Sequence, residues 1–273
     1  MKKAATLKKV SFIFLFCLIS TNLHAEKILR ISTTTSTENS GLLDVLNPVF
    51  EKQNNVRVDV IAVGTGKALK LGKNGDVDVV FVHAPEAELD FIAKGFGINR
   101  KAVMHNDFIF IGLALDPGNI KQSNSAIEVM QKINQNKLTF ISRGDDSGTH
   151  KKEKKLWQLA GIKPSGDWYI AVGQGMGAVL QIADEKRAYT LSDRGTYIAY
   201  QDKIDLDIIF EGDKLLFNPY HIMAVNPEKH PHVHYNLAQK YIAFVTGKQG
   251  QRIIANYKMK GQQLFYPDAL PEN

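Results

Sequence analysis

A polar loop between an expected strand and an expected helix reads Ser142-Arg143-Gly144-Asp145-Asp146-Ser147-Gly148-Thr149-His150. It follows a short apolar run at 138–141, typical of a buried strand, and precedes a segment of helical composition at 151–160. The start of a helix offers free backbone N–H groups, and this loop adds hydroxyl side chains and one arginine. Such groups hold a compact oxyanion. The loop therefore predicts one wall of an anion site.

The same order of strand, loop and helix recurs along the chain. Alternating apolar residues predict strands at 27–32 and 56–63, and the near-continuous apolar run at 77–82 is typical of a strand buried on both faces of a parallel sheet. A loop and a helical pattern follow each of them, most clearly at 42–53. Strands that alternate with helices in this way predict an α/β fold.

Two long extended stretches, near 107–115 and 215–225, break this alternation. A chain that begins in one lobe, crosses to a second lobe and returns needs two such crossings. We therefore expect two α/β lobes, with lobe one formed by residues 26–108 and 218–273 and lobe two by residues 109–217. A cleft between two lobes is a preferred place for small ligands, and hinge closure around a ligand belongs to such architectures.

The first 25 residues have the pattern of a secretory signal peptide. Lysines at positions 2, 3, 8 and 9 precede an apolar run at 10–19, and Ala25 ends an approximate cleavage site. The run is far shorter than the roughly 20 residues that span a membrane. We expect a cleaved leader and a periplasmic protein. The single cysteine, Cys17, lies in this leader, so the mature chain would have no disulfide.

The positive charge of the whole chain is mostly a property of the leader. Of 34 basic residues four lie in the leader, which has no acidic residue, so the mature chain would carry 30 basic against 28 acidic residues. That balance gives no reason to expect binding to nucleic acid.

Four loops between strands and helices carry the candidate ligand-binding residues. In an open α/β sheet such loops lie beyond the carboxyl ends of the strands, where ligands bind. Each hydroxyl donates one hydrogen bond, and an arginine adds charge and a planar set of donors. We expect Asp145 to orient Arg143. The expected donors are Thr34, Thr35, Ser36 and Thr65 from lobe one, and Arg143, Ser147, Gly148 and Thr149 from lobe two, with Ser192 and Arg194 as weaker candidates.

Other interpretations of these residues compete with an anion site. Serine and threonine before a helix are often only N-caps. Ser147 with His150 could suggest a nucleophile and a base, but the chain has no Gly-x-Ser-x-Gly turn and no third member to nominate. His230, His232 and His234 resemble metal-ligand spacing, although alternation around a proline favours a solvated surface. We expect a binding protein without catalytic residues, cofactor or bound metal cation; an enzyme acting on a phosphorylated metabolite and a sensor subunit are the alternatives.

Nearly the whole mature chain resembles the tungstate-binding periplasmic components of tungstate ABC importers. That resemblance implies the two-lobed fold of type II periplasmic binding proteins, a tetrahedral oxyanion as ligand, an ABC transporter permease as partner, and a monomer. It rests on Thr33-Thr34-Thr35-Ser36, on Ala62-Val63-Gly64-Thr65-Gly66-Lys67-Ala68-Leu69, on Gly75-Asp76-Val77-Asp78-Val79, on residues 142–149, and on Thr190-Leu191-Ser192-Asp193-Arg194-Gly195-Thr196-Tyr197.

The polar loop is also similar to that of phosphate-binding periplasmic proteins, in which Arg-x-Asp-x-Ser-Gly-Thr contacts the anion. The chain departs from that family after the strand at 77–82, where His83-Ala84 replaces the aspartate that accepts the proton of phosphate. Tungstate, molybdate and sulfate carry no proton near neutral pH, and an acceptor carboxylate would repel them. The resemblance favours tungstate, with molybdate, sulfate and phosphate as alternatives.

Overall fold

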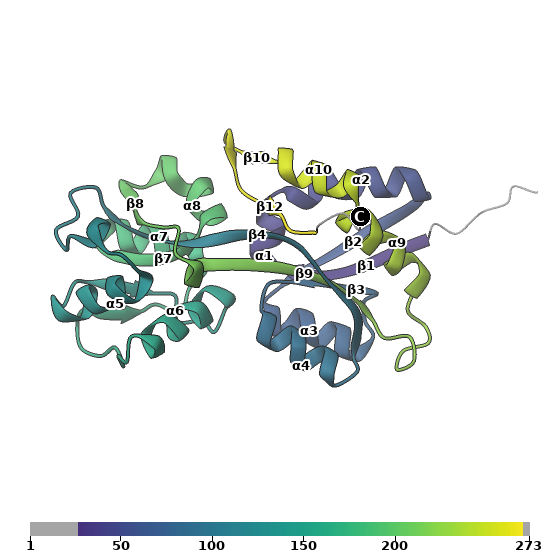
Figure 1. Ribbon diagram of the computed structural model, residues 1–273, viewed down its shortest axis with the longest axis horizontal. Helices are drawn as coiled ribbons and strands as arrows, with labels where there is room; N and C mark the ends of the chain where they lie inside the picture. Colours follow the sequence, from purple (N-terminus) through teal and green to yellow (C-terminus); the bar gives the residue numbers. More distant parts are fainter. Residues whose placement is uncertain (1–26, 270–273) are drawn as a thin grey trace, which may run out of the picture.

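The computed structural model describes residues 27–269, which form two α/β lobes joined by two long strands (Figure 1). These strands are β4 (Gly97–Leu113) and β9 (Phe217–Val225), and they pair with each other antiparallel from Gly97 opposite Val225 to Asp107 opposite Phe217. The two predicted crossings are therefore neighbours in one sheet. β4 begins well before the predicted stretch at 107–115, because its first half belongs to lobe one. The exact lobe boundaries remain predictions.

Lobe one contains the first three strands of the chain. β1 (Lys27–Thr34) pairs in parallel with β2 (Val56–Val63) and with β3 (Val79–Val82), and β9 closes the order β2-β1-β3-β9. The helices of this lobe are α1 (Thr35–Asn39), α2 (Leu42–Asn54), α3 (Thr65–Asn74), α4 (Pro85–Ala93), α9 (Tyr235–Thr246) and α10 (Lys248–Asn256).

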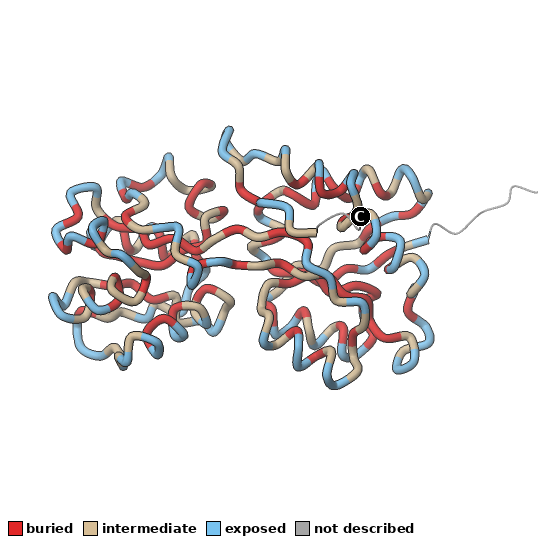
Figure 2. The backbone as a smooth tube through the Cα atoms, in the orientation of Figure 1, coloured by how far each residue is buried: buried red, intermediate tan, exposed pale blue. Residues whose placement is uncertain are grey.

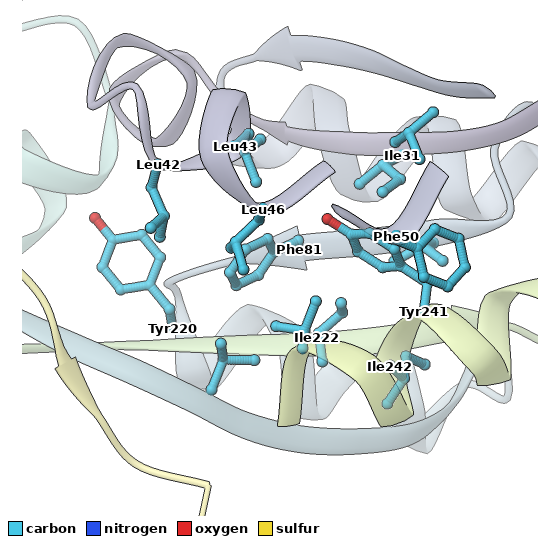
Figure 3. Close-up of a cluster of buried hydrophobic side chains, with 14 of the residues drawn as sticks. Ile31, Leu42, Leu43, Leu46, Phe50, Phe81, Tyr220, Ile222, Tyr241 and Ile242 are labelled. Carbon is cyan, nitrogen blue, oxygen red and sulfur yellow. The ribbon is translucent and has the colours of Figure 1, made fainter. Parts of the chain in front are cut away.

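The unbroken apolar run of β3 reflects helices on both faces of the lobe-one sheet. Val79 and Phe81 point into a cluster with α2 and α9, which contains Leu46 and Tyr241 (Figure 3). Val80 and Val82 point to the other face, into a smaller cluster with Phe91 of α4. Since successive side chains of a strand face opposite sides, a strand covered on both sides has no polar positions.

Lobe two repeats this plan with shorter strands. β5 (Phe140–Ser142) pairs in parallel with β6 (Tyr169–Ala171) and β7 (Tyr189–Asp193), and β7 pairs antiparallel with the second half of β4. Phe140 and Ile141 contribute to apolar clusters on opposite faces of the sheet. The helices are α5 (Ala126–Gln135), α6 (Gly148–Leu159), α7 (Met176–Glu185) and α8 (Arg194–Tyr200).

Several small elements differ from the sequence prediction. The hydroxyl-rich segment expected to be a loop after β1 contains the short helix α1, because the side chain of Thr34 caps it by accepting a hydrogen bond from Thr37 N–H. Strand β8 (Leu206–Phe210) was not predicted, and it pairs with β4 at the edge of lobe two. The remaining short elements are η1 (Ile120–Gln122), η2 (Gln201–Lys203), η3 (Lys214–Leu216), β10 (Lys258–Met259), β11 (Gln262–Gln263) and β12 (Tyr266–Pro267).

Buried residues fill the centre of each lobe and continue along the two crossing strands (Figure 2). Between residues 27 and 269, no helix has both the length and the apolar character needed to cross a membrane. The predicted signal peptide at 1–25, with Cys17, lies outside the described residues.

The topology directs the predicted loops toward the place where the lobes meet. β1 ends at Thr34, β5 at Ser142 and β7 at Asp193, and Asp193 lies opposite Phe108 in the middle of the crossing strand β4. β3 ends at Val82, opposite His221 of the other crossing strand. The carboxyl ends of the parallel strands in both lobes therefore face the hinge, where open α/β sheets bind ligands.

Candidate functional site

A cavity of about 280 Å³ lies between α1 of lobe one and the starts of α7 and α8 of lobe two. Hydroxyl groups, backbone and one arginine make up most of its polar lining. The predicted residues Thr35, Ser36 and Arg143 are among the lining residues; the others are Asn39, Ser40, Gly175, Met176, Gly177, Ala178, Gly195, Thr196, Ala199 and Tyr200. The cavity therefore has walls from both lobes.

Arg143 is held by Asp145, which lies in the same loop. The guanidinium Nε donates to the Asp145 carboxylate at 2.8 Å, and the Arg143 side chain keeps 15% of its surface exposed. The other carboxylate oxygen accepts from Ser147 N–H at 3.1 Å. Although burial opposes it, the hydrogen bonds of Ser147 and the charge of Arg143 hold the pKa of Asp145 below its usual value. Within the described chain, the two terminal guanidinium nitrogens of Arg143 have no hydrogen-bond partner, so they are available to an anion.

The buried carboxylate of Glu153 accepts hydrogen bonds next to the start of the loop that contains Arg143. Glu153 of α6 accepts from Ser142 Oγ at 2.8 Å, from Trp157 Nε1 at 3.1 Å and from Tyr169 Oη at 2.8 Å. Burial raises the pKa of Glu153, and these hydrogen bonds oppose that rise. Glu153 therefore links the end of β5, where Arg143 follows, to α6 and to β6.

Helix α6 points its first turn into the region between the lobes. Ser147 is its N-cap and accepts from His150 N–H at 3.3 Å, while Gly148 and Thr149 are its first residues. The His150 ring accepts from Asp146 N–H at 2.9 Å, and no hydrogen bond joins that ring to Ser147 Oγ in the described chain. Ser147 and His150 therefore do not form the pair of nucleophile and base that an enzyme would need. The free N–H groups of the helix start instead suit an anion.

Thr34 and Ser36 form a hydroxyl cluster on the wall of lobe one. Thr34 is buried, and its Oγ1 lies 2.7 Å from Thr37 Oγ1 and 3.1 Å from Ser36 Oγ. Thr34 thus positions its neighbours, whereas Thr35 and Ser36 reach the cavity. Thr65 is the buried first residue of α3 and does not line this cavity.

The sequence prediction did not include His83, which follows β3 and joins this hydroxyl cluster. Its Nε2 lies 3.1 Å from Thr34 Oγ1 and 3.4 Å from Ser36 Oγ, and its Nδ1 lies 2.9 Å from Asn218 Oδ1 on β9. The ring stacks on Tyr220 with centroids 4.5 Å apart. The available signal was positional, because His83 occupies the place of the phosphate family's aspartate.

The start of α7 is a second part of the site that the prediction did not include. Gly175 is its N-cap without a side-chain hydrogen bond, so the backbone N–H groups of the first turn have no such partner. Gly177 packs closely against Tyr200, since an added Cβ would lie 2.2 Å from Tyr200 Oη and the tyrosine ring would have to move. The glycine-rich segment before a helix was visible in the sequence, but it did not match a nucleotide-binding spacing.

Ser192 and Arg194, the weaker candidates, are engaged within lobe two. Arg194 donates to Asp107 through Nε and through a terminal nitrogen, both at 2.6 Å, and it also contacts Glu211. Ser192 is buried and donates to the carbonyl of Asp193. Neither residue lines the cavity, so we do not include them among the proposed ligand contacts.

A second hollow of about 650 Å³ lies beside the first, between α4, α6 and the crossing strands. His83 and Gly148 line it, and an added Cβ on Gly148 would lie 3.2 Å from His83 Cε1. One acidic residue, Glu86, also lines the hollow, but lysines outnumber it, and an excess of positive charge around a cleft attracts anions. The lysines that line it are Lys151, Lys152, Lys154, Lys155 and Lys214.

The three histidines with metal-like spacing bind lobe one instead. His230 Nε2 lies 2.9 Å from the carbonyl of Lys73, and His232 Nε2 lies 2.8 Å from that of Gly75. His234 pairs with Asp78 at 3.4 Å. In residues 27–269, no group of three or more histidine, cysteine, aspartate and glutamate side chains is arranged to hold a metal ion.

Two α/β lobes, two crossing strands and an interlobe cavity at the strand ends define a periplasmic-binding-protein fold. The chain belongs to the PBP superfamily, whose domain matches residues 20–249.

Close relatives have names that refer to tungstate. The chain is 47% identical over 243 residues to the tungstate-binding protein TupA of Peptoclostridium acidaminophilum, covering 88% of this chain and 85% of that protein. Among solved structures, that of the tungstate ABC transporter from Geobacter sulfurreducens is 59% identical, with a TM-score of 0.77, covering 84% of this chain and 98% of that one. TupA from Desulfovibrio alaskensis is 44% identical, with a TM-score of 0.83, covering 89% of this chain and 100% of that one.

Proposed function

We propose that this chain binds a tetrahedral oxyanion, tungstate, in the interlobe cleft and delivers it to an ABC importer. The observation that carries the proposal is Arg143, whose terminal nitrogens have no partner in the described chain and which lines one small cavity together with Ser36 of α1. Relatives named for tungstate binding support the choice of ligand. Those relatives are transport proteins, so the chain is a binding protein and not an enzyme.

The proposed contacts combine charge with helix starts. Arg143 would donate from lobe two and Thr35 and Ser36 from lobe one, and all three line the cavity. Gly148 and Thr149 do not line it. Gly148 lines the second hollow together with His83, and the free N–H groups at the start of α6 would reach the anion from that side. Nanomolar binding requires about −12 kcal/mol. Several charge-assisted hydrogen bonds, at roughly 1.5–3 kcal/mol each, supply that amount when the donors are already in place.

A proton-free dianion fits this set of donors better than phosphate does. Asp145, the carboxylate nearest to Arg143, uses its oxygens on Arg143 and on Ser147 N–H, so it does not offer them to a ligand proton. Tungstate and molybdate share charge and shape, and a competition titration of tungstate, molybdate, sulfate and phosphate separates them. Tighter binding of phosphate than of tungstate would overturn the ligand assignment.

The substitution Arg143→Ala is expected to weaken tungstate binding by roughly 100-fold or more, because it removes a charge-assisted donor pair worth about 3 kcal/mol. Titration calorimetry measures the affinity. Arg252→Ala is the matched control, since Arg252 is exposed on α10, away from the cavity lining. Equal tungstate affinity of Arg143→Ala and the control would contradict the site.

We further propose that the protein is exported, loses residues 1–25, and works as a monomer with a membrane permease. The lysines and the apolar run of the leader support export. The mass of the protein recovered from the periplasm tests cleavage, since a chain that still carries Met1 would contradict it. Light scattering of the mature protein tests the monomer.

A further inference from the structure

His83 lies beside the hinge, close to residues of both lobes. It belongs to lobe one, yet the N-terminal glycine of α6 in lobe two is so near that an added Cβ on Gly148 would lie 3.2 Å from the imidazole. On its other side, Nε2 lies 3.4 Å from Ser36 Oγ. An anion held by Ser36 and by the first N–H groups of α6 would therefore lie against Nε2 of His83.

The hydrogen bonds of His83 determine which nitrogen carries the proton. Asn218 Nδ2 donates to Asn106 Oδ1 at 2.7 Å, so Asn218 Oδ1 is the acceptor that faces His83. The His83 Nδ1–H donates to that oxygen. In the neutral ring Nε2 is then an acceptor, and the hydroxyl of Thr34 or of Ser36 donates a hydrogen bond to it.

Burial of His83 favours the neutral ring before the ligand binds. Burial against Tyr220 lowers the pKa of His83, and Arg143 lowers it further. The hydrogen bond to Asn218 and the carboxylates Asp193 of β7 and Glu88 of α4 act in the opposite direction, but they do not reverse the shift. A lone pair at Nε2 would repel an oxyanion. It also accepts a hydrogen bond from a hydroxyl group that could otherwise donate to the anion.

We propose that His83 binds the oxyanion through Nε2 and takes up one proton from solvent as the anion enters. This inference rests on the proposed function. A protonated Nε2 donates to the anion, and the hydroxyl of Ser36, which lines the cavity, is free to donate to the anion as well. The imidazolium adds positive charge opposite the dianion, where Arg143 is already paired with Asp145. A nearby negative charge favours the charged ring, so the protonated form is stable only with the anion bound.

Proton uptake predicts how affinity depends on pH. Well below the pKa of the free histidine both states are protonated, and affinity does not change with pH. Between the pKa values of the free and bound states each unit of rising pH weakens binding, and the slope approaches tenfold per unit. Tungstate itself carries no proton between pH 7 and 9, so a proton taken up in this range comes to the protein.

Calorimetric titration of the mature protein with sodium tungstate at about pH 7.5, in HEPES and in Tris, counts the protons, because the two buffers differ in ionisation enthalpy. We expect uptake of close to one proton per tungstate, and none for His83→Gln, whose amide donates without titrating. His230→Gln is the control, since that ring binds the carbonyl of Lys73 far from the cleft lining, and it should match the unsubstituted protein.

The unsubstituted protein alone decides the inference if His83→Gln fails to fold. Tungstate binding with no proton uptake, and with constant affinity between pH 7 and 9, would overturn the role of His83 and leave the proposed function intact. Uptake that persists in a folded His83→Gln would also overturn it. Absence of any tungstate binding would overturn the proposed function, and the inference with it.

Discussion

In the proposed site, Asp145 would contribute to anion binding without contacting the anion. Its two oxygens accept from Arg143 Nε and from Ser147 N–H, so it fixes the guanidinium and the N-cap of α6 together. A carboxylate 4 Å from a dianion would cost about 2 kcal/mol even in bulk water, but the charge of Asp145 is offset by Arg143 at 2.8 Å. Holding Arg143 and the first turn of α6 in place for the anion contributes more binding free energy than this repulsion costs.

Asp145→Asn is therefore expected to weaken tungstate binding by about tenfold, since one amide cannot accept both hydrogen bonds. The loss should be constant from pH 6 to 9. The folded-state pKa of Asp145 is lowered, so its contribution is complete above its unfolded pKa and is lost only as the pH falls through the lowered value. Equilibrium dialysis measures both quantities, and tighter binding by the variant would show that repulsion dominates.

Some residues that line the cavity were predictable from the sequence, where chemistry and position coincide. Arg143 and Ser36 stand out because a guanidinium and a hydroxyl that each follow a parallel strand suit an anion at the edge of the sheet. Arg194 has the same chemistry, but it pairs with Asp107, a contact between residues 87 positions apart that sequence order cannot reveal. The sequence analysis noted His83 only because it replaces the aspartate of phosphate-binding proteins. Its hydrogen bond to Asn218, 135 positions away, could not be predicted from the sequence.

Among the elements, helix α6 has two roles: its first turn offers proposed contacts to the anion, and its residue Glu153 stabilises lobe two. Its first turn faces the cleft, and one turn later Glu153 points into lobe two, where the buried Ser142 and Trp157 and the half-buried Tyr169 donate to it. A buried carboxylate costs desolvation, which the raised pKa of Glu153 reflects. Once folded, however, the donors around it have no other acceptor.

Glu153→Ala should lower the free energy of unfolding by about 3 kcal/mol or more, because it leaves buried donors of Ser142, Trp157 and Tyr169 unpaired. Glu153→Gln keeps one acceptor oxygen and the shape of the side chain, so it should lose less. Urea denaturation of both variants measures the difference. Equal losses would show that the packing of the side chain, not its acceptor oxygens, stabilises the loop.

Elements with strong periodicity were predicted well from the sequence, and elements defined by pairing were not. The strand prediction at 56–63 coincides with β2, and the helix prediction at 42–53 ends one residue before α2 does. The first half of β4 alternates apolar and charged residues weakly, and it is a strand because β9 pairs with it. In the same way, β8 is a strand because it pairs with β4.

At the scale of the whole molecule, the two crossing strands unite the cores of both lobes. On β4, Val103 and Met104 belong to the apolar core of lobe one, while Phe108 and Phe110 belong to that of lobe two. If β4 came apart with one lobe, apolar side chains in the core of the other lobe would be exposed to water. We therefore expect both lobes to unfold in one transition.

An oxyanion bound by both lobes should shift that single transition as a whole. A ligand at 1,000 times its dissociation constant stabilises the folded state by about 4 kcal/mol. For a chain of roughly 250 residues that raises the melting temperature by on the order of 10 °C. Scanning calorimetry with and without tungstate measures the shift, and Arg143→Ala should lose most of it. A split transition, in which tungstate moves only one component, would show that the anion contacts one lobe and that the cleft does not close around it.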